Sequence, residues 1–196
     1  MSKHKKSQKP RRNYQGARTL SQVADAANYF LDEAERCSRS EPVMGFAAMT
    51  TALACVIAIG EALVGQPRSQ DHACINAFCK KMTSLDWLLS SPTNQAQQQS
   101  PADILWNVRN ALAHALSLPS NVVLVPTKAS YADYSAKFEI GIVPSLFVEA
   151  VRKTIKEVIS QQPTITFDPT RVHKPLQIDR SPVKVDSLPS SGSMPA

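Results

Sequence analysis

The stretch VMGFAAMTTALACVIAIG, at residues 43–60, contains no charged side chain and decides how this chain folds. As a helix its 18 residues would reach only ~27 Å, and they are rich in Ala, Gly and Thr rather than in Leu and Phe. Small residues let helices approach closely, so we predict that this stretch is the central buried helix of a soluble bundle. Its length leaves a membrane-spanning helix as the alternative.

Helical signals lie on both sides of this stretch. Thr19 and Gln22 form the pattern of a capping box, and apolar residues follow them at helical spacing to about residue 40. Beyond the stretch, apolar residues at the same spacing predict a third helix over residues 69–90. The uncharged stretch would therefore be surrounded by amphipathic helices.

The second half of the chain predicts two more helices and a small β element. Ser100 before Pro101 is a strong helix start, because serine caps a helix and proline fits its first turn, and Pro144 opens the last helix. Residues 122–125 and 136–142 favour strands and are separated by a polar loop, which predicts a hairpin. The expected fold class is all-α, a bundle of about five helices with a small β-hairpin between the last two.

The net charge of +6 is concentrated at one end of the chain. Residues 1–18 hold seven basic residues and no acidic one, whereas residues 19–167 hold 11 basic and 13 acidic residues. We predict a disordered basic arm at 1–18, a helical domain at 19–162 and a disordered Pro/Ser-rich tail at 163–196. The arm either keeps the protein soluble or contacts an acidic partner such as nucleic acid, and in a membrane-associated protein it would bind anionic lipid.

The chain has four cysteines, at Cys37, Cys55, Cys74 and Cys79. No secretory signal precedes them, so we expect reduced and mostly buried thiols in a cytoplasmic protein. Cys74 and Cys79 lie near His72, which makes zinc an alternative, but their spacing is not Cys-x-x-Cys and no second pair of ligands follows. We therefore expect no metal site and no cofactor.

The fourth predicted helix carries polar residues that point to chemistry. One stripe is apolar, and a second, polar stripe holds Asp103, Asn107, Asn110 and His114 at intervals of four, three and four, with Arg109 beside it. Arginine offers a planar fork of donors that suits phosphate, and histidine is the side chain whose charge changes near neutral pH. These types suit phosphodiester cleavage, in which one group neutralises the phosphate and another moves protons. The simpler interpretation is that they form only the solvated face of a helix.

The spacing of Arg109 and His114 bears on how such a site is assembled. Five residues at ~100° each place the two side chains ~140° apart around the helix axis. A long arginine side chain can bend back only part of the way. A second copy of the helix, related by two-fold symmetry, supplies the missing partner more easily, so we expect a site between the subunits of a homodimer.

The sequence RNALAH at 109–114 is similar to the Arg-polar-x-x-x-His signature of the HEPN domain family, near the start of that family's last core helix. The resemblance implies a helical bundle, commonly dimeric, in a family with many metal-independent endoribonucleases, among them toxins of toxin–antitoxin pairs and effectors of antiviral defence. It implies that Arg109 binds the scissile phosphate, that His114 is the general acid or base, and that Asn110 orients the phosphate or the histidine. The implied reaction is attack by the ribose 2′-OH, which leaves a 2′,3′-cyclic phosphate.

Glu61, at the end of the central helix, either adds an acidic group to substrate binding or simply meets solvent. We therefore expect a cytoplasmic, metal-independent endoribonuclease that binds RNA, forms a homodimer and does not enter membranes. A cognate antitoxin or a regulatory protein is the further partner that the family implies. The alternative is a non-catalytic HEPN-like module that binds a nucleotide or a protein, because the near-neutral domain offers no broad basic surface for RNA.

Overall fold

The computed structural model describes residues 18–40, 44–65, 70–90, 99–161 and 166–167. This part of the chain contains five α-helices, a short 3-10 helix, a three-stranded sheet and one further strand pair. The predicted all-α fold with a small β element is confirmed. Disorder in the arm and in the tail is a prediction that falls almost entirely outside the described residues.

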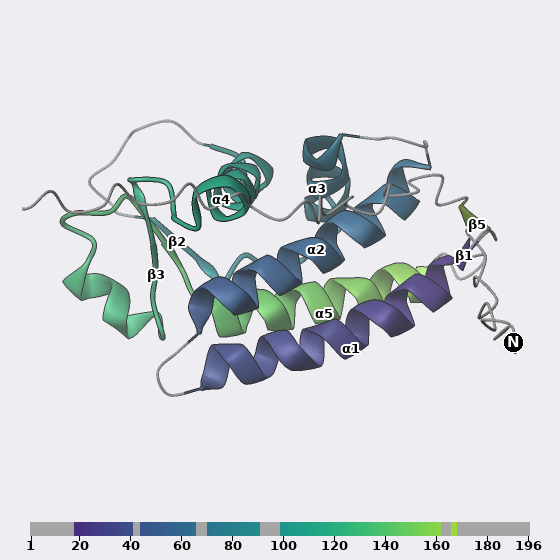
Figure 1. Ribbon diagram of the computed structural model, residues 1–196, viewed down its shortest axis with the longest axis horizontal. Helices are drawn as coiled ribbons and strands as arrows, with labels where there is room; N and C mark the ends of the chain where they lie inside the picture. Colours follow the sequence, from purple (N-terminus) through teal and green to yellow (C-terminus); the bar gives the residue numbers. More distant parts are fainter. Residues whose placement is uncertain (1–17, 41–43, 66–69, 91–98, 162–165, 168–196) are drawn as a thin grey trace, which may run out of the picture.

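Three long helices lie side by side along the molecule: α1 (Leu20–Arg39), α2 (Gly45–Val64) and α5 (Pro144–Gln161). α1 runs in the direction opposite to α2 and α5 (Figure 1). The predicted capping box starts α1, since the backbone N–H of Gln22 donates to Thr19 Oγ1 at 3.2 Å and that of Thr19 donates to Gln22 Oε1 at 3.0 Å. These reciprocal bonds satisfy two backbone donors that a helix start otherwise leaves open.

α2 occupies the centre of the bundle, as its uncharged sequence predicts. It packs against α1, α3, α4 and α5, and Met49, Val56 and Ile59 are fully buried. α2 is also the one helix of the described residues that is long and apolar enough to cross a membrane, and half of its most apolar window is buried inside the protein. The core helix of a soluble bundle has the same length and composition, so a soluble protein is compatible with this finding.

α3 (Asp71–Cys79) and α4 (Pro101–Ala115) lie on the side of α2 away from α1 (Figure 1). The approach of α2 to α3 depends on the missing side chain of Gly60. A Cβ atom at Gly60 would lie 2.6 Å from the carbonyl carbon of Cys74 and 2.9 Å from its Cα, both within the backbone of α3. This close crossing fixes the first turn of α3 beside α4.

The small sheet differs from the predicted hairpin. Its strand order is β2 (Leu88–Ser90), β4 (Ile140–Ile142) and β3 (Val122–Leu124), with β3 parallel to β4 and β2 antiparallel to it. The 15 residues between β3 and β4 include the 3-10 helix Ala129–Asp133 and are long enough for the crossover that a parallel pair needs. The hairpin between the last two helices is therefore wrong in its pairing, although both strands exist.

The helix predicted over residues 69–90 is also too long. α3 ends at Cys79, and the chain then turns and enters β2. In the turn, Ser84 Oγ accepts from the backbone N–H of Asp86 and donates to its carboxylate, and such local bonds compete with a helix. Trp87 is fully buried and its ring packs 4.9 Å from that of Phe147 on α5. Tertiary packing thus replaces the last turns of the predicted helix.

A second strand pair joins the two ends of the domain. β1 (Arg18–Thr19) pairs antiparallel with β5 (Thr166–Phe167). The sequence places Arg18 in the basic arm and residues 166–167 in the tail, so both boundaries are set too close to the helices. The pairing adds backbone hydrogen bonds that composition does not predict.

Candidate functional site

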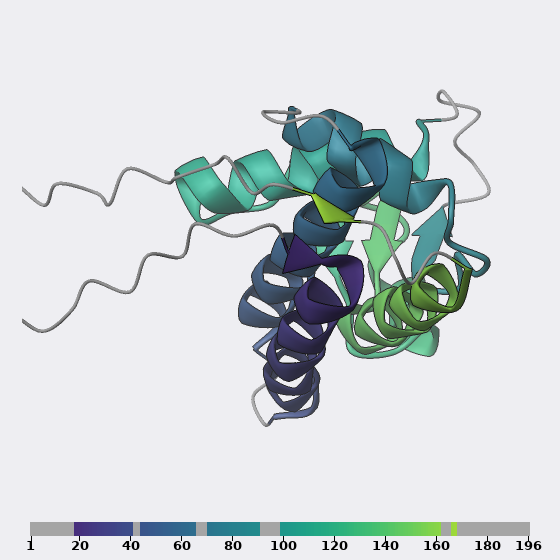
Figure 2. The same cartoon turned by 90° about the vertical axis from the view of Figure 1, so that its right-hand side faces the viewer.

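α4 is half embedded and half exposed. Ser100 caps it, with Ser100 Oγ accepting from the backbone N–H of Asp103 at 3.2 Å, and Leu105 and Val108 bury its inner side. The C-terminal turn is exposed and ends at Leu116, whose side chain is 83% exposed and whose φ of 47° is in the left-handed region. Figure 2 shows α4, in teal, projecting beyond the side of the bundle. The helix therefore offers its last turns to solvent or to another chain.

Arg109 is held by contacts on both sides of its guanidinium group. One terminal nitrogen donates to Asp71 Oδ2 of α3 at 2.5 Å, and the other donates to Asn110 Oδ1 at 3.1 Å. The Arg109 Cζ atom also lies 5.7 Å from the centre of the Trp106 ring, within the range of a cation–π contact. The ion pair is partly buried, with side chains 30% and 16% exposed. A phosphate that binds Arg109 must therefore share the N–H donors of the guanidinium with Asp71, or displace Asp71 from them.

The structure brings Arg109 and Asn110 together but leaves His114 apart from them. His114 lies in the last turn of α4 and is exposed. Among the described residues, no hydrogen bond or ion pair joins His114 to Arg109. Arg109 turns toward α3, whereas His114 is on the projecting end of the helix. Within the described part of the chain, the contacts of Arg109 are with Asp71, Asn110 and Trp106 and do not include His114.

Glu61 and Asp71 are the acidic residues of the helix pair next to the site. Glu61 is half-buried in the last turns of α2, one residue after the crossing at Gly60. The carboxylate that contacts Arg109 belongs to Asp71, in the first turn of α3. Sequence reasoning missed Asp71, and its only signal was an acidic residue near the start of a predicted helix.

His72, next to Asp71 in α3, also takes part in this arrangement. Its Nε2 lies 2.9 Å from Asp103 Oδ1, and its ring meets the Trp106 ring edge-on at 5.6 Å between centres. Hydrogen bonds from Ser100 and then from His72 lower the pKa of the Asp103 carboxyl, so Asp103 is ionised at neutral pH. Sequence reasoning gave His72 no catalytic role, and Asp103 was recognised only as part of the polar stripe.

The cysteines behave as structural thiols. All four are reduced, and burial raises the pKa of Cys79 to about 12 and that of Cys55 to about 11. A thiol binds metal or attacks a substrate as the thiolate, which burial disfavours here. No group of three or more His, Cys, Asp or Glu side chains in the described part of the chain is arranged to hold a metal ion.

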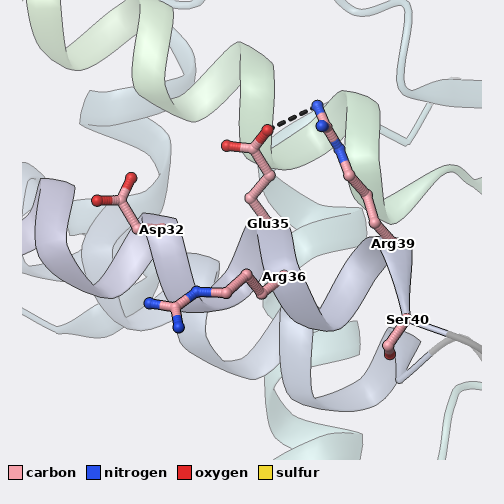
Figure 3. Close-up of a pocket in the computed structure, with 5 residues that line it drawn as sticks. All are labelled: Asp32, Glu35, Arg36, Arg39 and Ser40. Carbon is pink, nitrogen blue, oxygen red and sulfur yellow. Dashed lines mark ion pairs between the residues drawn. The ribbon is translucent and has the colours of Figure 1, made fainter.

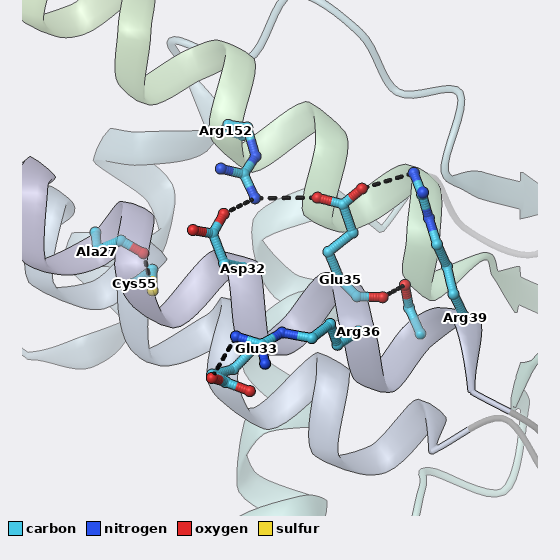
Figure 4. A network of polar contacts seen from close by, with 9 residues as sticks. Ala27, Asp32, Glu33, Glu35, Arg36, Arg39, Cys55 and Arg152 are labelled. Atoms are coloured by element: carbon cyan, nitrogen blue, oxygen red, sulfur yellow. Dashed lines mark hydrogen bonds and ion pairs between the residues drawn. The ribbon is translucent and has the colours of Figure 1, made fainter.

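A hollow of about 410 Å³ lies at the C-terminal end of α1, lined by Asp32, Glu35, Arg36, Arg39 and Ser40 (Figure 3). Its charges are engaged with one another and with α5. Arg152 of α5 bridges Asp32 at 2.9 Å and Glu35 at 3.2 Å, and Arg39 contacts the other oxygen of Glu35 at 2.6 Å (Figure 4). None of the lining residues belongs to α3 or α4. We interpret this network as a clamp between α1 and α5.

Comparisons of the chain with protein-family models, with curated proteins and with solved structures give no match. The contacts between α3 and α4 are therefore the features of this chain that bear on its function.

Proposed function

We propose that this chain is a metal-independent endoribonuclease of the HEPN type, which cleaves RNA by attack of the ribose 2′-OH. The proposal depends on one observation: Arg109 and Asn110 lie half-buried where α4 meets α3, with the guanidinium partly exposed, and His114 lies exposed on the last turn of the same helix. Arg109 would neutralise the pentavalent phosphorane, and Asn110 would orient the guanidinium. His114 would transfer a proton.

The exposed end of α4 supports a site shared between two copies. His114 and Leu116 lie at this end, and a large apolar side chain that is 83% exposed gains free energy when a second subunit covers it. Two-fold pairing at this end would set His114 of one subunit near Arg109 of the other. The substrate is RNA, the location is the cytoplasm, and a cognate antitoxin or regulatory protein would cover the same surface.

Cleavage of bulk RNA by the purified chain in EDTA tests the proposal. We expect cleavage with 2′,3′-cyclic phosphate ends that is lost in Arg109→Ala and His114→Ala, both checked for folding by circular dichroism. Asn107→Ala, an exposed residue on the same helix, is the matched control and should cleave normally. Cleavage that survives both site substitutions would remove the site.

Mixing the two inactive variants tests the shared site directly. A heterodimer of Arg109→Ala and His114→Ala contains one intact pair of groups, so random exchange of subunits restores about a quarter of the wild-type activity. Mixing Arg109→Ala with the double variant restores none, because no subunit then supplies the arginine. Absence of recovery in the first mixture, with subunit exchange verified, contradicts assembly between subunits.

The alternative, a non-catalytic binding module, is favoured by the Asp71–Arg109 ion pair. Arg109 already has a carboxylate and an amide as partners, as an arginine that holds α3 against α4 would have. In that case Arg109→Ala and Asp71→Ala destabilise the fold, and their double-mutant cycle shows strong coupling. In the nuclease, Asp71→Asn frees the Arg109 guanidinium from its carboxylate partner. The chain should then bind an uncleavable 2′-O-methyl oligonucleotide more tightly. Calorimetry with this oligonucleotide and with mononucleotides separates the two functions.

A further inference from the structure

His72 of α3 follows Asp71, the carboxylate partner of Arg109, and is itself held by side chains of α4. Its Nε2–H donates to Asp103 Oδ1 at 2.9 Å, while Asp103 Oδ2 accepts from Ser100 Oγ at 2.6 Å. Ser100 also accepts from the backbone N–H of Asp103, so the helix cap holds the carboxylate from two directions. In the neutral imidazole, a carboxylate that holds the proton on Nε2 leaves the lone pair on Nδ1, which is the tautomer that a general base needs.

The same residues place His72 next to the phosphate-binding arginine. The imidazole ring and the Arg109 guanidinium both contact the indole of Trp106, at 5.6 Å and 5.7 Å from its centre. Asp71, the neighbour of His72 in α3, is the partner of Arg109. The His72 side chain is 41% exposed, so its ring is open to solvent and to a ligand.

We propose that His72, oriented by Asp103, is the general base of the site and that His114 is its general acid; this inference rests on the proposed nuclease function. Cleavage through the 2′-OH requires two proton transfers, one from the nucleophile and one to the leaving group. His72 Nδ1 takes the proton of the 2′-OH as the 2′-oxygen bonds to phosphorus. The bond from phosphorus to the 5′-oxygen breaks, and that oxygen receives a proton from the His114 imidazolium.

These steps balance without any further reactant. The products are a 2′,3′-cyclic phosphate and a 5′-OH, and proton exchange with water returns each histidine to its starting state. The Asp103 carboxylate stabilises the imidazolium that His72 becomes, so Asp103 is a positioning residue. The charged residue in contact with this imidazole is Asp103; Asp71, its neighbour on α3, is paired with Arg109 of α4, and Glu61 lies on α2, which packs against α3.

The test compares cleavage and binding in the full-length chain. His72→Ala should lower the rate of cleavage of an RNA oligonucleotide about 100-fold or more, the usual share of a general base. Its Kd for the uncleavable 2′-O-methyl oligonucleotide should stay at the wild-type value, and added imidazole should restore part of the rate. Asp103→Asn, which keeps the size of the side chain, should lower kcat with little change in KM.

Each other outcome overturns the inference in a recognisable way. If His72→Ala cleaves at the wild-type rate while His114→Ala and Arg109→Ala do not, the nuclease stands and His72 is not its base. If the loss in His72→Ala is matched by a weaker Kd, or resists imidazole in a variant that is folded, His72 binds or packs only. His72→Gln replaces His72→Ala in every measurement if the alanine variant unfolds. A wild-type chain that cleaves no RNA refutes the proposed function and this inference together.

Discussion

Replacing Gly60 with alanine tests the crossing on which the candidate site depends. The added Cβ would lie 2.6 Å from the carbonyl carbon of Cys74, where ordinary contacts begin at 3.4 Å. The atoms it meets are backbone atoms of α3, which cannot rotate away as a flexible side chain can. α3 must therefore move outward by about 1 Å, and it carries Asp71 and His72 with it.

The size of the effect follows from two opposing terms. Overpacking a well-packed contact costs about 1–3 kcal/mol, and a clash with backbone belongs at the upper end. Alanine in place of glycine within a helix returns about 1 kcal/mol. We expect Gly60→Ala to lower the free energy of unfolding by about 2 kcal/mol, which is roughly 4–8 °C in Tm for a domain of this size.

Urea unfolding followed by circular dichroism measures this change, with a lower midpoint and an unchanged slope. Ala54→Gly, at an exposed position of the same helix, is the matched control and measures the helix-propensity term alone, about 1 kcal/mol. RNA cleavage by Gly60→Ala should fall by more than its loss of stability explains, because the α3 residues have moved. A variant as stable as the wild type would refute the close crossing.

Three further predictions concern other parts of the fold. Arg152→Met should lower the free energy of unfolding by about 1 kcal/mol, because it removes the contacts with Asp32 and Glu35, and most of this difference should vanish in urea titrations at 1 M salt. The free energy of unfolding should stay constant up to about pH 9 and decrease as the pH rises toward 11 and 12. The reason is that the Cys55 and Cys79 thiols keep their protons in the folded chain at pH values where the unfolded chain has lost them. Cys79→Ser should make this decrease with pH smaller. Leu116→Gly should stabilise the monomer by about 1 kcal/mol through its left-handed φ and yet weaken self-association in analytical ultracentrifugation, whereas unchanged association would contradict an interface at this end of α4.

The sequence predicts helix starts well because their signals are local. The caps at Thr19 and Ser100 each bond a residue three positions on, Pro101 directly follows Ser100, and these features are present in the structure. The central position of α2 was predictable for a related reason, since an uncharged helix that is not in a membrane has to be buried.

Elements that depend on distant partners could not be predicted in the same way. β2 forms because Leu88 pairs with Ile142, and the sequence around residue 88 does not predict that pairing. An apolar spacing that suits a helix also suits a turn followed by a strand when Trp87 finds a place in the core. The predicted hairpin is wrong for a similar reason. Strand propensity indicates where strands form, but not whether two strands pair parallel or antiparallel.

The candidate site shows the same division. Arg109, Asn110 and His114 could be named because they lie within six residues on one helix. The contacts of Asp71 with Arg109 and of His72 with Asp103 join residues 38 and 31 positions apart. They exist because α3 packs against α4 in the fold, with α3 held close to α2 at Gly60. A short motif therefore identified one helix of the site, and only the fold identified the other.

The contacts of Arg109 explain how the same motif can serve either proposed function. Asp71 neutralises the guanidinium in the folded chain, and Trp106 covers one face of it, so α3 and α4 remain together without substrate. In the proposed nuclease, a dianionic transition state would attract the guanidinium more strongly than a single carboxylate does, so Asp71 would yield to the phosphorane more readily than to a ground-state phosphate. This difference would let the proposed enzyme work without tight binding of RNA, as expected for a domain that has no net positive charge beyond its N-terminal arm. A binding module forms no such transition state, so nothing would displace Asp71 from Arg109. In that case the ion pair would persist.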